Sequence, residues 1–197
     1  MNFLAHTYLS PKNDIIMLGN LSGDFVKGKS MDGIHEDIAK GARLHREIDT
    51  FTDSHDKFKS AKRIVSPIFN HYSGVLIDMF YDYFLAKKWK EQNIIKFEEH
   101  IQTIYQSGTD NKLILPERFQ PVLPIMIKFD WLTSYSTHDG LTNILTQMTN
   151  RINNKALLYQ GVDLLIKHED QFEELFNEFW ISITSEFDTF PDNKLSI

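Results

Sequence analysis

The stretch from Leu44 to Asp53 holds a high density of side chains that can bind metal ions. If this stretch is helical, His45 and Asp49 lie one turn apart on the same face, and Asp53 follows one turn later. Imidazole and carboxylate groups at this spacing can converge on one divalent cation. Solvated charges on an amphipathic helix would give the same pattern. The stretch alone leaves both interpretations open.

Two further acids, Asp78 and Asp82, lie in a segment that is otherwise apolar. Between residues 72 and 89, apolar side chains cover nearly the whole circumference of a helix, which predicts a central, buried helix. The two acids are one turn apart on it. Because burying unpaired carboxylates is costly, we expect a cation against them.

The cation beside these two acids has two possible sources. One is an ion-pair network with Arg43, Arg46 or Arg63. The other is a metal ion that His45 binds together with Asp78, Asp82 and Asp24, the last of which lies in a turn after Gly23. Two ligand-bearing helices in one helical chain favour the metal.

Composition limits the chemistry. The chain of 197 residues contains no cysteine, so a metal must be held by His, Asp, Glu, backbone or water ligands. Charged residues make up 24% and hydrophobic residues 42%, which is ordinary for one soluble globular domain. The formal net charge of −6 argues against a general nucleic-acid binder. No stretch resembles a secretory signal or approaches a membrane span, and we expect a cytoplasmic protein that binds no membrane.

Apolar residues recur at helical spacing almost throughout, which predicts an all-α, single-domain helical bundle. The domain is expected to span residues 1–190, with a loose tail over residues 191–197. Helices that matter for the site are expected at about residues 34–55, 72–89 and 94–105. Pro67 is expected to interrupt the helical segment that starts at Asp56.

Four ordered motifs resemble the acyl carrier protein phosphodiesterase family, also called acyl carrier protein hydrolase. They are NFLAH at residues 2–6, GN at 19–20 with GDFVKG at 23–28, G at 41 with HREIDTFTDSH at 45–55, and GVLIDMFYDYFLA at 74–86. The likeness is close over the first half of the chain, and residues 130–132 and 150–151 are compatible with it.

The resemblance implies hydrolysis of the phosphodiester that joins phosphopantetheine to a serine of holo acyl carrier protein. It also implies dependence on manganese and a divergent, HD-domain-like fold, because the family is distantly related to the all-helical HD phosphohydrolases. Those enzymes bind metal partly through a His-Asp doublet. This chain has Tyr83 after Asp82, where many relatives have histidine, so the HD arrangement does not carry over residue by residue.

On this hypothesis, Asp24, His45, Asp78 and Asp82 would bind one or two divalent ions, which the resemblance implies to be Mn²⁺ and which would activate water and neutralise charge on the phosphate. Arg46 could bind a phosphate oxygen through its planar guanidinium. Asp49 is the first candidate for orienting His45 or for handling a proton, and His6 is the second. Plain ion-pair or capping roles remain the alternative for each of them.

Acyl carrier proteins are acidic, so this acidic chain would need a local basic surface to bind one as its substrate. Residues in the run after the motif could supply it, namely Lys57, Lys62 and Arg63. A solvated face is the alternative. Two rival functions also remain: an HD-like phosphohydrolase acting on another phosphoester, such as a nucleotide, and a non-catalytic helical binding protein whose acids are structural.

Overall fold

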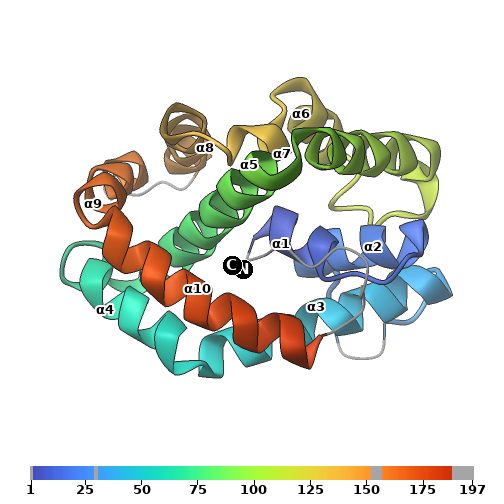
Figure 1. Cartoon of the computed structure of the whole chain (residues 1–197). Coiled ribbons are helices and arrows are strands. Elements are labelled where there is room, and N and C mark those ends of the chain that lie inside the picture. The colour runs from blue at the N-terminus through green and yellow to red at the C-terminus, as the bar shows by residue number, and fades with distance from the viewer. Residues whose placement is uncertain (1, 29–30, 152–156, 188–197) are drawn as a thin grey trace.

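A long helix, α5 (Ser73–Asp110), runs through the middle of the molecule (Figure 1). The computed structural model describes residues 2–28, 31–151 and 157–187. Side chains all around the first half of α5 are buried, including Leu76, Phe80 and Phe84, which confirms the predicted central helix. The backbone leaves helical geometry at Asn93 (φ −159°, ψ 88°), so the helices predicted at 72–89 and 94–105 are the two halves of one bent helix.

Every regular element of the described residues is helical, which confirms the all-α prediction. Around α5 pack α4 (Asp56–Phe69), α6 (Leu123–Lys128), α7 (Trp131–Ser134), α8 (His138–Arg151), α9 (Gly161–Lys167) and α10 (Glu169–Glu186). Their buried apolar side chains form one main core that extends from Leu4 to Ile183. The tail predicted from residue 191 onward lies outside the described residues.

Three helices near the N-terminus build one side of the molecule: α1 (Phe3–Tyr8), α2 (Asp14–Leu21) and α3 (Glu36–Ser54). The backbones of α2 and α3 touch because glycine occupies the crossing point. A Cβ on Gly41 would lie 2.0 Å from the carbonyl oxygen of Ile16, and one on Gly19 would lie 2.3 Å from that of Ile38. This close approach brings the end of α2, and the short 3-10 turn η1 (Gly23–Phe25) after it, against α3.

The prediction that Pro67 interrupts a helix is wrong. Pro67 lies in the last turn of α4, which continues to Phe69. A proline inside a helix leaves the carbonyl four residues earlier without its N–H partner. Here that carbonyl belongs to Arg63, and the hydroxyl of Ser66 donates to it at 3.3 Å. The local hydroxyl therefore offsets part of the cost of the proline.

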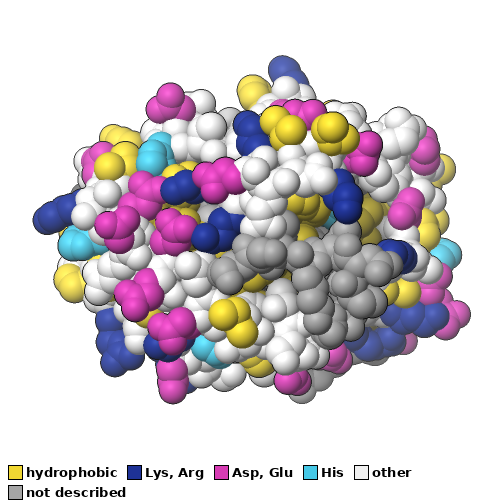
Figure 2. All heavy atoms as spheres, in the orientation of Figure 1, with side chains coloured by type: hydrophobic (Ala, Val, Ile, Leu, Met, Phe, Trp, Pro, Cys, Tyr) yellow, Lys and Arg dark blue, Asp and Glu magenta, His cyan; other side chains and the backbone are white. Residues whose placement is uncertain are grey.

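Acidic side chains gather on the surface over α10, with basic side chains between them (Figure 2). The ammonium groups of Lys57, Lys87 and Lys88 lie within ion-pair distance of glutamates on α10. Lysines from α4 and α5 therefore form ion pairs with this acidic surface. In the part of the chain that the structure describes, no helix has both the length and the apolar character needed to cross a bilayer.

Candidate metal centre

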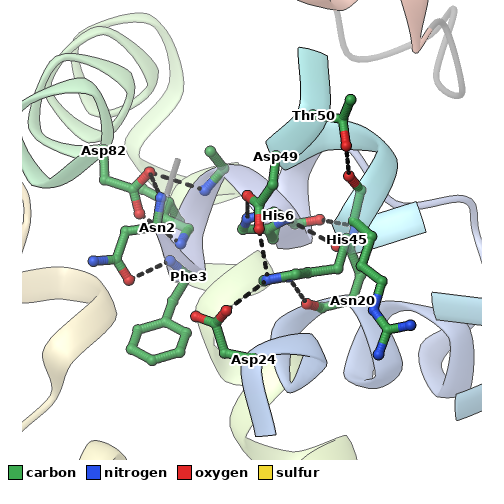
Figure 3. Close-up of polar contacts among 12 residues, drawn as sticks. Asn2, Phe3, His6, Asn20, Asp24, His45, Asp49, Thr50 and Asp82 are labelled. Carbon is green, nitrogen blue, oxygen red and sulfur yellow. Dashed lines mark hydrogen bonds and ion pairs between the residues drawn. The ribbon is translucent and has the colours of Figure 1, made fainter. Parts of the chain in front are cut away.

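Two histidines and one aspartate converge between α1 and α3 (Figure 3). One ligand atom from each of His6, His45 and Asp49 lies within 4.8 Å of the other two. The Nε2 atoms of His6 and His45 lie 3.3 and 3.2 Å from the two carboxylate oxygens of Asp49. The two imidazole rings are stacked, with centroids 3.9 Å apart. His45 and Asp49 share one face of α3, as their spacing predicted, and His6 comes from α1.

Asn20, at the end of α2, fixes the orientation of both imidazoles. Its backbone carbonyl lies 2.8 Å from Nδ1 of His45, and its side-chain Oδ1 lies 2.9 Å from Nδ1 of His6. The side-chain amide donates to the carbonyl of His6 and to the hydroxyl of Ser10, so Oδ1 is left as the acceptor. Both Nδ1 atoms must therefore carry the proton. Each Nε2 faces Asp49 as a potential ligand atom, the arrangement found around protein-bound metals.

The turn η1 completes this side of the site. A Cβ on Gly23 would lie 2.3 Å from Cγ of His45, so only glycine lets the turn pass under the imidazole ring. The next residue, Asp24, places Oδ1 3.2 Å from Nε2 of His45, and its side chain is 73% exposed. Asp24 therefore approaches the centre from the solvent side.

The charges at the site are strongly coupled. Burial lowers the pKa of His6 to about 4, so this ring is neutral near pH 7. Burial also lowers the pKa of His45, but hydrogen bonds to Asp24 and Asp49 more than offset this and raise it to about 9. Burial raises the pKa of Asp49, but contacts with the two histidines lower it by more, and the net result is a pKa well below the usual range of an aspartate. A hydrogen bond with His45 lowers the pKa of Asp24.

A divalent cation fits these residues for a specific reason. The Nε2 of His6 is buried, carries a lone pair that faces Asp49, and has no hydrogen-bond partner among the described residues. A buried polar atom without a partner is costly. A cation bound by Nε2 of both histidines and by Asp49 would satisfy it and would replace the proton on His45. The donor set of two imidazoles and one carboxylate is common for Zn²⁺, Fe²⁺ and related ions.

A cavity of about 290 Å³ opens beside the centre. Its polar lining residues are Asn2, His6, Asp24, His45, Asp78 and Gln147. The rest of the wall is mostly apolar and comes from several elements, with Phe3, Phe25, Val75, Met79, Val122, Trp131, Ile144 and Met148. A ligand that has both a charged group and a mostly uncharged body would match this mixed lining.

The two acids of α5 occupy different environments. Asp78 lines the cavity, and burial raises its pKa, but it is not in the group of three converging residues. Asp82 is fully buried and accepts hydrogen bonds from the backbone N–H groups of Asn2, Leu4 and Ala5. For Asp82 the structure thus supplies helix N–H groups where we expected a cation. Burial raises the pKa of Asp82 to about 7.

The basic side chains predicted at the site lie outside the cavity lining. Arg46 donates to the carbonyls of Val26 and Gly28, on the segment that follows η1. Lys57 pairs with Glu178 on α10 at 2.7 Å. On the same helix as Lys57, Lys62 lies 5.6 Å from the centroid of the Phe58 ring, and Arg63 donates to Ser60. The binding roles of Arg46, Lys57, Lys62 and Arg63 stay predictions.

Sequence reasoning missed the part that Asn20 plays. In the sequence, Asn20 draws attention only as part of the Gly19-Asn20 pair. Its side chain binds His6 and its backbone carbonyl binds His45, and contacts between such distant positions leave no periodic signal in the sequence. The sequence makes His6 only the second candidate for orienting His45 or handling a proton, whereas in the structure it is one of the three converging residues. Tyr83, which follows Asp82, donates its hydroxyl to Glu169 of α10 and is not among the three converging residues.

Comparison with known proteins shows the family to which this chain belongs. The model of the acyl carrier protein phosphodiesterase family matches residues 1–183. A protein of that name from Pectobacterium atrosepticum is 32% identical over 184 residues, covering 91% of this chain and 94% of its own. Its namesake from Photorhabdus laumondii is 27% identical, with 91% of each chain covered. No solved structure matches, so the relation to HD phosphohydrolases stays a prediction.

Proposed function

This chain belongs to the acyl carrier protein phosphodiesterase family, and we propose that it removes phosphopantetheine from holo acyl carrier protein with the help of one divalent cation. His6, His45 and Asp49 would hold the cation. The observation that carries the metal is the buried Nε2 of His6, which faces a carboxylate without a hydrogen bond. We propose Mn²⁺ as the cation.

When bound, the cation would activate water and neutralise charge that develops on the phosphate. The protein's own contribution begins with Asn20, which holds both Nδ1–H groups so that the Nε2 atoms point inward. We propose that Asp24, whose exposed carboxylate lies beside His45, orients the attacking water. These groups are fixed before substrate arrives, which lowers the cost of reaching the transition state.

The leaving group of this reaction is the serine oxygen of the carrier protein, which needs a proton as its bond to phosphorus breaks. Asp78 is the group we propose for this step. It lines the same cavity as the centre, and burial raises its pKa, which favours the protonated form that a general acid requires. The predicted role of Asp78 as a metal ligand is replaced by this one in our proposal.

The rest of the cavity suits the pantetheine arm. The arm is long and uncharged beyond its phosphate, and the wall formed by Val75, Met79, Trp131 and Met148 is apolar. Gln147 also lines the cavity and offers an amide for the peptide-like groups of the arm. In this proposal the phosphate would lie beside His6 and His45, and the arm would contact the apolar lining residues.

The test is a mass-spectrometric assay. Purified protein is incubated with holo acyl carrier protein and Mn²⁺, and the mass of the carrier is followed over time. We expect loss of the prosthetic group, no loss after treatment with EDTA, and recovery when Mn²⁺ is added back. Zn²⁺ and Fe²⁺ in parallel samples test the identity of the metal, because the donor set accepts several ions. A carrier that keeps its full mass under all these conditions would refute the substrate.

A variant separates the centre from the fold. Asp49→Asn keeps the volume of the side chain and removes its charge, and we expect it to abolish turnover. Asp53→Asn, one turn later on α3, is the matched control and should leave the rate unchanged, because Asp53 is not among the converging residues. The predicted cytoplasmic location belongs with this proposal, because the enzyme must meet its carrier protein there.

A further inference from the structure

The N-terminal helix α1 is anchored by a carboxylate that comes from another helix (Figure 3). Asp82 on α5 accepts from the N–H of Leu4 at 2.8 Å through Oδ2. Its Oδ1 accepts from the N–H groups of Asn2 and Ala5 at 3.2 and 3.3 Å. The N–H of Phe3 is bound by the side chain of Asn2 at 2.8 Å. The first turn of α1 thus has partners for its N–H groups, most of them on one buried side chain.

This anchor matters because α1 spans only six residues. A helix of one to two turns is not stable by itself in water, so its position depends on contacts with the rest of the protein. A carboxylate at a helix N-terminus binds free N–H groups and interacts favourably with the helix dipole. Asp82 is fully buried, and its hydrogen bonds to the first turn of α1 constrain the position of this helix along α5 and its rotation about its own axis.

His6 follows Ala5 directly, and it is the one member of the converging trio that does not come from α3. The register of α3 alone fixes the distance between His45 and Asp49. The distance from either of them to His6 depends on where α1 lies. Asn20 binds the ring of His6 directly, whereas Asp82 binds the N–H of Ala5, the residue before His6.

We infer that Asp82 is a positioning residue, which fixes His6 at the metal centre through the backbone of α1. Both of its carboxylate oxygens are already engaged by N–H groups, so it acts through His6 and not as a ligand. The inference rests on the metal centre of the proposed function. It accounts for a buried acid on the central helix whose oxygens, among the described residues, accept from backbone N–H groups.

The test is the binding of Mn²⁺ alone, followed by electron paramagnetic resonance, together with hydrogen exchange of the α1 amides. Asp82→Asn replaces one accepting oxygen by an amide that donates toward other donors. We expect its Mn²⁺ affinity to fall about 10-fold or more, the range seen when groups that orient metal ligands are removed. The amides of Leu4 and Ala5 should exchange much faster. Tyr83→Phe is the control: it lies on the same helix and loses one hydrogen bond, to Glu169, and should change neither readout.

A double-mutant cycle shows whether Asp82 acts through His6. In a His6→Ala background, Asp82→Asn should cause no further loss of Mn²⁺ affinity. An equal loss in both backgrounds would overturn the inference, as would an unchanged affinity of Asp82→Asn in the wild-type background. If Asp82→Asn does not fold, hydrogen exchange of the wild-type protein tests the inference instead. Amides of Leu4 and Ala5 that exchange as fast as those of a frayed terminus would then overturn it. A wild type that binds none of Mn²⁺, Zn²⁺ and Fe²⁺ would refute the metal centre itself, while the exchange readout would still test the anchor.

Discussion

Replacement of Asn20 by alanine should damage the metal centre without removing any ligand. The side chain is fully buried and makes three hydrogen bonds, to Nδ1 of His6, to the carbonyl of His6 and to the hydroxyl of Ser10. Each bond contributes roughly 1 kcal/mol, so we expect a loss of about 3 kcal/mol in the free energy of unfolding. For a domain of this size, that corresponds to a fall in Tm of roughly 6–12 °C.

The effect on metal binding should be partial. His45 keeps its partner in Asn20→Ala, because that partner is the backbone carbonyl of residue 20. His6 loses the acceptor that holds its Nδ1–H, so its ring is free to rotate and to present the wrong nitrogen. We expect Mn²⁺ affinity to fall about 10- to 100-fold, the range measured when such orienting partners are removed. Isothermal titration with Mn²⁺ and thermal unfolding of the same samples measure both quantities.

Ser22→Ala is the matched control for this experiment. Ser22 is also fully buried and lies two residues further on, and its hydroxyl donates to the carbonyl of Leu18, away from both histidines. We expect a loss of about 1 kcal/mol in stability and an unchanged Mn²⁺ affinity. The reasoning fails if Asn20→Ala lowers Tm as expected but binds Mn²⁺ as tightly as the control, because Asn20 would then be a structural residue only.

Three further predictions concern other parts of the molecule. Gly23→Ala places a Cβ against the ring of His45, and Mn²⁺ titration should show at least a 10-fold loss of affinity; retained affinity would mean that the turn can move aside. Lys62→Glu should lower kcat/KM for holo acyl carrier protein at low salt more than Lys57→Glu does, because Lys57 is already paired with Glu178. Equal kcat/KM values for both variants and the wild type would refute a basic docking surface. Burial lowers the pKa of His100 to about 4, so the unfolded chain, with a pKa near 6.5, binds the proton more readily, and stability should fall as pH drops from about 6.5 to 4. Urea unfolding should show that this loss, roughly 3 kcal/mol by pH 4, is smaller in His100→Gln; an identical pH dependence would contradict it.

The helices could be predicted from the sequence because their signals are local. Apolar residues around the whole circumference of residues 72–89 predicted the buried half of α5, and the spacing of His45 and Asp49 placed both on one face of α3. Pro67 misled the prediction because the hydroxyl of Ser66 compensates the carbonyl that proline leaves free. A hydrogen bond of this kind depends on a side-chain rotamer, which periodicity does not encode.

The centre was only half predictable, since its members come from elements that meet in space. Nothing in the pattern of α1 indicates that His6 lies beside His45, because the two residues come from different helices and meet only in the folded structure. For Asp82, the sequence predicted burial correctly and led us to expect a cation. Its partners are backbone N–H groups, which every residue except proline carries, so no residue type reveals them.

The most direct test of the metal centre is anomalous diffraction from a crystal grown with Mn²⁺. We predict a manganese peak at bonding distance from Nε2 of His6, Nε2 of His45 and a carboxylate oxygen of Asp49. Asp82 should remain hydrogen-bonded to the amides of α1 in the same crystal. A crystal with no peak at these three residues, or with its peak at Asp78 and Asp82 instead, would contradict the site described above.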